Sequence, residues 1–414
     1  MDKVFKNSSV RSYVRAISSK SEAHRALISA CLADRRTKII CTDSNADIEA
    51  TAACLRSLGA KITRECDGFV VDPIENLSTG ALLDCNESGS TLRFLLPLCA
   101  ALGVDCSFIM RGRLSDRPLS PLYELLADNG VTISPQGTNP LKICGRLMAG
   151  DYSIAANVSS QYISGLLFAL CVSCGKSTLT LDGNIESAPY IWMTADTLAA
   201  FGADVKFNSD TNTFYINGKE RLVSPELYEV GGDWSNAAFF LSAGAIGSHP
   251  VTLTGLDQNS RQGDRAILRV LREMGAEIVL SDSGITVHPS SLHGISIDAA
   301  DIPDLVPILA TVASVARGQT RIFNASRLRL KESDRILSVC QTLSSLGADI
   351  TPTDDGMVIV GKKMLSGGVV DSWGDHRIAM SAAVASLVCE GEVRINRFEA
   401  INKSYPSFLD GWEN

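Results

Sequence analysis

The sequence lacks a long uninterrupted apolar run. Its longest apolar stretch, residues 94–110, is broken by Pro97 and Asp105, whereas a membrane-spanning helix needs about 20 predominantly apolar residues. Residues 1–6 also lack the apolar core of a secretory signal peptide. We therefore expect a cytoplasmic protein that is neither exported nor inserted in a membrane.

The chain also lacks the glycine-rich motifs that bind nucleotides. No P-loop is present, and no G-x-G-x-x-G follows a strand pattern, so nothing predicts a nucleotide cofactor. The net charge of −8 disfavours a general nucleic-acid-binding surface. Cys171 and Cys174 form a C-x-x-C without a second pair or a nearby histidine, which is more typical of thiols in a helix core. We expect no cofactor and no metal.

What the chain does have is a repeated phrase, "large apolar, x, x, apolar, Gly, Ala". The glycine of the phrase is Gly59, Gly202, Gly275 and Gly347 in its four copies, and a weaker copy contains Gly130. Successive glycines are 71, 72, 73 and 72 residues apart. A fixed period of this length indicates one supersecondary unit copied along the chain.

Each copy reads as helix, strand, helix, strand, strand. The glycine ends a helical pattern, as a C-cap glycine does, and a hairpin pattern follows it. Six apolar helix starts recur along the chain, so six copies are expected, in two domains of three. The predicted limits are 14–228 for one domain and 1–13 plus 229–414 for the other. Strand-like residues 4–17 should complete the C-terminal copy, which makes the two chain ends neighbours.

Polar residues gather where these apolar helices begin. The starts are Ser21, Ser90, Ser160, Trp234, Asp304 and Asp375. Each alone is typical of a satisfied helix cap. Helix N-termini also present free N–H groups and the positive end of the dipole, so several that converge would bind anions.

Two cationic segments strengthen that prediction. Residues 111–118 contain three arginines, and residues 327–335 contain four cations and two acids. Arginine suits bidentate capture of carboxylate or phosphate. The sequence therefore predicts a small, multiply anionic substrate, with Asp304, Glu332 and His376 as candidate acids and bases. A solvated charged face remains the alternative for the second segment.

Four motifs resemble the enolpyruvyl transferase family over essentially the whole chain. They are Lys20-Ser21-x-x-x-Arg25, Ser159-Ser160-Gln161, Arg329-Leu-Lys331-Glu332-Ser-Asp334-Arg335 and Asp375-His376-Arg377. The resemblance implies an α/β fold of six repeated units in two three-unit domains, an inside-out α/β barrel. It also implies two chain crossovers, near 13–20 and 228–233, and domains that close over the substrates.

Within this family, the motifs resemble those of members that join phosphoenolpyruvate to the 5-hydroxyl of shikimate 3-phosphate and release phosphate. The resemblance implies shikimate 3-phosphate ligands Lys20, Ser21, Arg25, Ser159, Ser160, Gln161, Ser187, Asp304 and Lys331. The implied phosphoenolpyruvate ligands are Lys20, Gly89, Arg117, Gln161, Arg335, Arg377 and Lys403. The implied catalytic residues are Asp304 as base on the hydroxyl, Glu332 as proton donor to the methylene carbon, Lys20 and His376.

The second helix start departs from the family pattern. Residues 87–90 read Glu-Ser-Gly-Ser where relatives have Asn-x-Gly-Thr, and Phe94 replaces a proline after Arg93. Arg327 stands where relatives often have Asn or Glu, so no role is carried over to it. The retained Gly89 implies sensitivity to glyphosate, which occupies the phosphoenolpyruvate site in this family.

Three alternatives remain at this point. A family member acting on UDP-N-acetylglucosamine would carry a reactive cysteine in the loop corresponding to 110–118, and this loop has none. A six-unit clamp around DNA would spread its basic residues over the inner helix faces, which here are apolar. An inactive phosphate-binding scaffold would not need every acid, base and cation position of the family to be filled, and in this sequence all of them are filled. We expect a monomer whose partners are small-molecule substrates.

Overall fold

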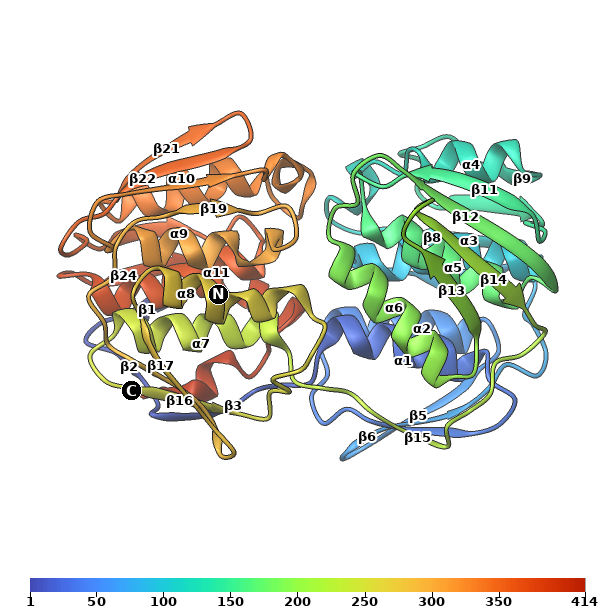
Figure 1. Ribbon diagram of the computed structural model, residues 1–414, viewed down its shortest axis with the longest axis horizontal. Coiled ribbons are helices and arrows are strands. Elements are labelled where there is room, and N and C mark those ends of the chain that lie inside the picture. Colours follow the sequence, from blue (N-terminus) through green and yellow to red (C-terminus); the bar gives the residue numbers. More distant parts are fainter. Residues whose placement is uncertain (414) are drawn as a thin grey trace. The chain divides into compact units, whose positions relative to one another are not determined.

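A computed structural model describes residues 1–413. The chain forms two compact units, one continuous (Ser18–Val230) and one discontinuous (Met1–Ile17 with the residues from Gly231 onward). They are shown in Figure 1. The limits expected from the sequence were 14–228 and 1–13 plus 229–414.

The continuous unit contains three four-stranded sheets, in the orders β15-β4-β6-β5, β7-β8-β10-β9 and β11-β12-β14-β13. Its helices are α1 (Lys20–Cys31), α2 (Ala46–Ser57), α3 (Gly89–Leu102), α4 (Leu122–Asp128), α5 (Ser160–Val172) and α6 (Ala188–Ala200), with a 3₁₀ turn η1 (Leu114–Asp116). Its strands are β4 (Thr37–Ile40), β5 (Lys61–Glu65), β6 (Gly68–Asp72), β7 (Ala81–Asp84), β8 (Cys106–Ile109), β9 (Val131–Ile133), β10 (Leu141–Gly145), β11 (Asp151–Ala155), β12 (Gly175–Asp182), β13 (Asp204–Asn208), β14 (Thr213–Gly218) and β15 (Leu227–Glu229).

The discontinuous unit has sheets ordered β17-β18-β16-β3, β19-β20-β22-β21 and β1-β24-β23, and a short β2-β25 pair. Its helices are α7 (Trp234–Ile246), α8 (Ile267–Glu273), α9 (Val306–Ala313), α10 (Arg335–Ser345) and α11 (His376–Ala385), with 3₁₀ turns η2 (Gly263–Ala266), η3 (Pro303–Leu305), η4 (Ser326–Leu330), η5 (Ser386–Val388), η6 (Phe398–Lys403) and η7 (Phe408–Gly411). Its strands are β1 (Lys3–Phe5), β2 (Ser9–Val10), β3 (Tyr13–Arg15), β16 (Val251–Thr254), β17 (Glu277–Ser281), β18 (Gly284–His288), β19 (Ser296–Asp298), β20 (Gln319–Phe323), β21 (Asp349–Thr353), β22 (Gly356–Val360), β23 (Gly368–Asp371), β24 (Val393–Asn396) and β25 (Trp412–Glu413).

Six related copies, three in each unit, confirm the prediction from the repeat. The five repeat glycines all have positive φ, between +72° and +116°, which is the backbone that glycine adopts without strain where a helix ends. One part of the prediction was wrong: each copy begins with an additional strand. That strand pairs in parallel with the strand after the first helix, as β11 does with β12.

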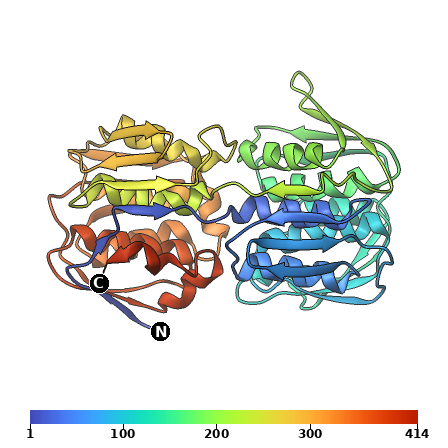
Figure 2. The same cartoon turned by 90° about the horizontal axis from the view of Figure 1, so that it is seen from below.

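Two of these leading strands are exchanged between the units. β3 precedes α1 in the chain but pairs with β16, and β15 precedes α7 but pairs with β4. Figure 2 shows the blue β3 beside yellow strands, and the yellow-green β15 beside blue ones. The chain passes between the units at these two places, at 17–18 and 230–231.

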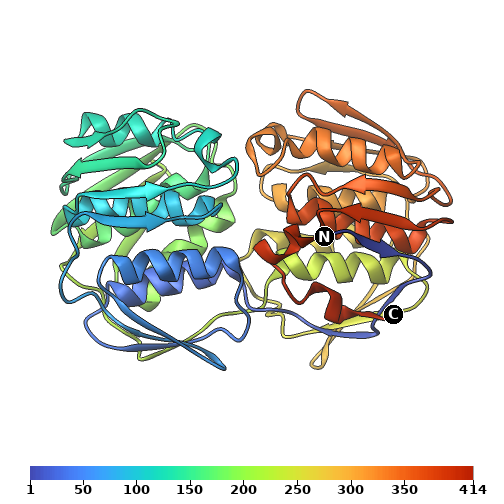
Figure 3. The same ribbon diagram turned by 180° about the vertical axis from the view of Figure 1, so that it is seen from behind.

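The chain ends lie together, as predicted. β1 pairs antiparallel with β24, and Ser9 and Val10 pair with the terminal strand β25. Figure 3 shows the blue β1 beside red strands. The assignment of all of residues 4–17 to the last copy was wrong, because β3 pairs with β16 and so belongs to the sheet of the fourth copy.

The first helix of each copy forms the core. In the discontinuous unit α7, α9 and α11 contact one another, and almost every side chain on them is buried. In the continuous unit α3 and α5 hold the same place, and α1 packs against α3. Helices that are apolar all round have to be covered on every side, and the charged side chains of these helices lie only in their first two turns.

None of the helices formed by residues 1–413 has the length and apolar character needed to cross a membrane.

Candidate functional site

The first helix of each copy is α1, α3, α5, α7, α9 or α11, and five of these six helices have an N-cap side chain. These caps explain why polar residues recur at the helix starts. Ser19, Ser88, Ser159, Asp233 and Asp375 each accept a hydrogen bond from a backbone N–H of the first turn of their helix. The fifth helix differs from the prediction. It is entered through the 3₁₀ turn η3 without a side-chain cap, which leaves the carboxylate of Asp304 for other contacts.

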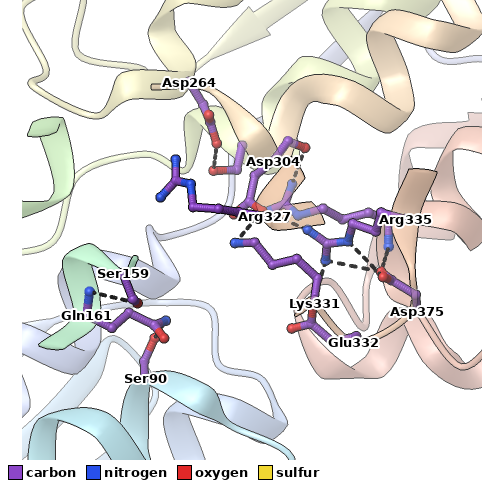
Figure 4. Close-up of polar contacts among 12 residues, drawn as sticks. Ser90, Ser159, Gln161, Asp264, Asp304, Arg327, Lys331, Glu332, Arg335 and Asp375 are labelled. Atoms are coloured by element: carbon purple, nitrogen blue, oxygen red, sulfur yellow. Dashed lines mark hydrogen bonds and ion pairs between the residues drawn. The ribbon is translucent and has the colours of Figure 1, made fainter. Parts of the chain in front are cut away.

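In the discontinuous unit, that carboxylate lies among three cations. Arg335 Nη1 is 2.7 Å from Asp304 Oδ1, Arg377 Nη2 is 3.1 Å from Oδ2, and Lys331 Nζ is 3.5 Å from Oδ1. Figure 4 shows Lys331 and Arg335 directed toward Asp304. Burial raises the pKa of Asp304, but the charges of Arg377, Lys331 and Arg335 outweigh burial and hold the pKa well below its usual range.

Arg335 joins this carboxylate to two others. Its Nη2 donates to Glu332 Oε2 at 2.8 Å, and its Nε donates to Asp375 Oδ2 at 2.8 Å. Arg335 is 1% exposed and Asp375 is fully buried. Burial lowers the pKa of Arg335, but Asp375, Glu332 and Asp304 together raise it above the ordinary arginine value, so the guanidinium stays charged.

The remaining predicted residues of this unit lie at the same cluster. Lys403, at the end of η6, has its Nζ 3.7 Å from Glu332 Oε1. His376 begins α11 and is buried, with Nδ1 3.7 Å from Asp375 Oδ1. Glu332 therefore lies near two cations, and His376 lies beside the carboxylate that holds Arg335.

In the continuous unit, Lys20 and Arg25 extend from the first turns of α1. Lys20 Nζ is 2.8 Å from Asp47 Oδ2. Arg25 is 2% exposed and donates from Nε to Thr194 Oγ1 at 2.8 Å and from Nη2 to the Tyr190 carbonyl at 2.9 Å. Burial lowers the pKa of Arg25 to about 10, although its tyrosine and glutamate neighbours raise it. Arg25 thus joins α1 to α6, which Ser187 precedes.

The starts of α3 and α5 are linked by polar contacts. Gln161 Nε2 donates to Ser90 Oγ at 3.0 Å, while Arg93 Nη1 donates to Gln161 Oε1 at 2.7 Å. Figure 4 shows Gln161 between Ser90 and Ser159. Ser159 accepts from the Gln161 backbone N–H, and Ser160 is the first residue of α5.

Arg117 packs onto Gly89 at this end of α3. A Cβ atom added to Gly89 would lie 2.8 Å from Arg117 Nη1 and 3.1 Å from Arg93 Nη1. Both distances are shorter than ordinary carbon–nitrogen contacts, so only glycine leaves the two guanidinium groups in place. Gly89 therefore sets how closely two cations approach the N-terminus of α3.

Ser187 stands apart among the predicted residues because its backbone is left-handed. It precedes α6 with φ 53° and ψ 36°, and its side chain makes no capping hydrogen bond. A serine in this conformation is uncommon outside turns and functional sites.

The predicted site residues thus form two groups, one in each unit. In the discontinuous unit, the contacts around Arg335 bring together Asp304, Lys331, Glu332, Arg335, His376, Arg377 and Lys403. In the continuous unit, α1, α3, α5, η1 and the start of α6 carry Lys20, Ser21, Arg25, Gly89, Arg117, Ser159, Ser160, Gln161 and Ser187. The approach of the two groups to each other stays a prediction.

Sequence reasoning gave no role to four side chains that hold the site residues. Asp375 anchors Arg335, Asp47 pairs with Lys20, Arg93 orients Gln161, and Thr194 accepts from Arg25. The N-cap pattern before α11 was a usable signal for Asp375. No spacing signal marks Asp47 or Thr194, because they come from the second helices of their copies.

The cysteines form no metal site in the described part of the chain. No group of three or more His, Cys, Asp or Glu side chains that could hold a metal ion occurs in residues 1–413. Cys171 is buried in α5, where burial raises its pKa to about 12, and Cys174 is exposed beyond the end of that helix.

A family model described as EPSP synthase (3-phosphoshikimate 1-carboxyvinyltransferase) matches residues 4–412. The chain belongs to the EPSP synthase family. It is 41% identical over 406 residues to the 3-phosphoshikimate 1-carboxyvinyltransferase of Clostridium novyi (strain NT), which covers 95% of this chain and 93% of the relative. It is 42% identical over 412 residues to the enzyme of the same name from Clostridium perfringens (strain 13 / Type A), with 98% and 96% covered.

Solved structures show the same fold in this family. An EPSP synthase from Acinetobacter baumannii superimposes with a TM-score of 0.81 at 27% identity, covering 99% of this chain and 96% of that one. A second structure from the same organism gives 0.80 at 25% identity, covering 100% and 99%. The α/β fold of six repeated units expected from the resemblance is therefore confirmed.

Proposed function

We propose that this EPSP synthase family member transfers the enolpyruvyl group of phosphoenolpyruvate to the 5-hydroxyl of shikimate 3-phosphate and releases phosphate. Membership over residues 4–412 supports this reaction. The observation that carries the chemistry is the cluster in which Asp304 and Glu332 share one buried guanidinium, Arg335. An acid and a base acting on different reactants have to be held close together for such a transfer.

The cations of the discontinuous unit would hold phosphoenolpyruvate. Arg335, Arg377 and Lys403 are all buried and paired with carboxylates. An incoming carboxylate and phosphate would compete with Asp304 and Glu332 for these cations. Asp304 would then lose part of the charge that lowers its pKa and become a stronger base toward the 5-hydroxyl, with Lys331 on the same substrate ring.

Glu332 would supply the proton to the methylene carbon of phosphoenolpyruvate, which makes the adjacent carbon, the one that carries the phosphate ester oxygen, electrophilic. Lys403 and Arg335 stabilise its anionic form once the proton is gone. His376, next to Asp375, would support this end of the site. The site needs many cations for two reasons: they neutralise the carboxylates and phosphates of the two substrates, and they stabilise the charge that develops during the reaction.

The continuous unit would supply the shikimate 3-phosphate ligands. Ser159 caps α5 and Ser160 is its first residue. The N-terminal N–H groups of this helix suit a phosphate, and Ser187 would contribute to the same site. Lys20, Ser21, Arg25 and Gln161 would contact this substrate. Lys20 and Gln161 would also reach phosphoenolpyruvate, together with Gly89 and Arg117.

The decisive experiment measures phosphate release from phosphoenolpyruvate with and without shikimate 3-phosphate. We expect release only when both substrates are present, and the mass of the organic product to rise by one enolpyruvyl group. UDP-N-acetylglucosamine in place of shikimate 3-phosphate should give no release. Turnover with the UDP-sugar alone would contradict the proposal.

The partners are small-molecule substrates, and we further propose that the enzyme is a cytoplasmic monomer. Sedimentation at micromolar concentration should give a single species with the mass of one chain, with and without both substrates. A stable dimer would contradict the monomer proposal.

A further inference from the structure

Four buried side chains form a chain of hydrogen bonds that links α1, α2 and α3 in the continuous unit. His24 of α1 contacts Thr51 of α2 (Nδ1 to Oγ1, 2.7 Å), and Thr51 contacts Thr91 of α3 (Oγ1 to Oγ1, 2.6 Å). Thr91 Oγ1 donates to Ser88 Oγ at 2.8 Å. The three hydroxyl residues are fully buried and His24 is 1% exposed. None of the roles proposed above uses any of these four residues.

Counting protons fixes the direction of this chain. The single hydroxyl proton of Thr91 is donated to Ser88, so Thr91 must accept from Thr51. The Thr51 proton is then used as well, so Thr51 must accept from His24 Nδ1. His24 therefore carries its proton on Nδ1, and every hydrogen bond in the chain runs from His24 toward Ser88.

The surroundings of the imidazole agree with this tautomer. His24 Nε2 is buried and has no hydrogen-bond partner among residues 1–413. A bare acceptor is tolerated there more easily than an unsatisfied N–H donor. Burial also lowers the pKa of His24 to about 3, with Lys20 and Arg25 lowering it further and Asp47 opposing them. The ring is neutral near pH 7.

The hydrogen-bond chain ends at Ser88, the N-cap residue of α3, which begins with Gly89. Ser88 Oγ accepts from both the backbone N–H and the hydroxyl of Thr91, at 3.2 Å and 2.8 Å, so both of its lone pairs are held. The cap fixes the first turn of α3, whose Gly89 lies against Arg117 and whose Ser90 contacts Gln161.

We propose that His24 is a positioning residue whose Nδ1–H starts a one-way hydrogen-bond chain through Thr51 and Thr91, holding the Ser88 cap and with it the anion-binding end of α3. The kinetic part rests on the proposed function, because it concerns the phosphoenolpyruvate end of the site. The direction of the chain does not, because it is a property of the free protein.

The tautomer is tested on the free enzyme by nitrogen-15 NMR of labelled histidine at pH 7. The chain has five histidines, so the spectrum is small, and His24→Asn assigns the signal by removing it. We expect a protonated Nδ1 and an unprotonated Nε2. A proton on Nε2, or an imidazolium, would overturn the proposal even if the enzyme were inactive.

Kinetics test the positioning role. Thr51→Val breaks the chain and should raise KM for phosphoenolpyruvate about fivefold, the effect of about one hydrogen bond, with kcat changed less. Thr51→Ser keeps the hydroxyl and should restore the wild-type KM. Thr37→Val is the matched control. Thr37 lies in β4 and is fully buried, and its Oγ1 contacts Ser224 Oγ at 2.7 Å, so the variant also removes a buried hydroxyl.

The control should lose a similar amount of stability and keep its KM. Equal KM for Thr51→Val and wild type, or an equal rise in Thr37→Val, would show a purely structural hydroxyl chain and overturn the positioning role. Phosphate release by the wild type is measured first, so that failure of the proposed reaction is recognised separately.

Discussion

Arg335 and Asp375 form a buried ion pair with two contacts, from Nε to Oδ2 at 2.8 Å and from Nη2 to Oδ1 at 3.3 Å. Asp375 also caps α11 by accepting from the Arg377 backbone N–H at 3.0 Å. One carboxylate thus fixes a guanidinium and a helix start together. The remaining N–H groups of Arg335 are left facing Asp304 and Glu332, which is how a cap residue sets the geometry of the candidate acid and base.

Arg335→Lys should lower the free energy of unfolding by about 3 kcal/mol, because an ammonium cannot bridge three carboxylates and a buried carboxylate would lose its partner. Urea denaturation at pH 7 measures the change. Arg329→Lys is the control, since Arg329 pairs with Asp334 at 3.1 Å at a partly exposed position. It should cost less than about 1 kcal/mol. Equal losses would contradict the special position of Arg335.

Asp304→Asn should lower kcat by about 10² to 10⁴, the usual contribution of a general base, while both substrates still bind. The asparagine keeps the size of the side chain but cannot accept the 5-hydroxyl proton. Steady-state kinetics and calorimetric titration measure the two effects. The exposed Asp349→Asn serves as control and should retain wild-type kcat. Undiminished turnover would remove Asp304 from its proposed role.

Gly89→Ala should raise KM for phosphoenolpyruvate about tenfold and leave KM for shikimate 3-phosphate nearly unchanged. The added methyl group would displace the Arg117 guanidinium, whose Nη1 lies 2.8 Å from the methyl position, and a displaced charge-assisted contact costs about 1.4 kcal/mol or more. Gly150→Ala is the control, because its methyl group would meet only ordinary contacts, at 3.6 Å from Tyr152. A higher KM for shikimate 3-phosphate alone would contradict the assignment.

His24 should make stability fall as the pH is lowered. The pKa of His24 is about 3 in the folded protein, against 6.5 for an ordinary histidine, so only the unfolded chain takes up a proton between these values. The stability from the neutral ring is complete above pH 6.5 and is lost toward pH 3, at no more than about 1.4 kcal/mol per pH unit.

Urea denaturation at pH 7 and pH 5 of wild type and His24→Asn tests this. The variant should lose less stability than the wild type between the two values, whereas Thr37→Val, which adds no titrating group, should keep the wild-type difference. The same loss in His24→Asn as in the wild type would show that the buried ring does not cause it.

The sequence could predict the features that are encoded within a few residues of each other. The glycine after each second helix has positive φ in all five complete copies, and five of the six predicted helix starts carry a capping side chain. The exception, Asp304, is instructive. Its residue type fits a cap, but Pro303 leads the chain through a 3₁₀ turn and frees the carboxylate.

The sequence by itself determined the repeat, the helix caps and the closure of the two chain ends, because local backbone geometry and the period of apolar residues specify them. Only the tertiary structure decided which sheets receive β3 and β15, and that Arg335 bridges three carboxylates while His24 leads a hydroxyl chain to Ser88. These contacts join residues from different helices and strands. No local pattern selects such partners, since they depend on how whole elements pack.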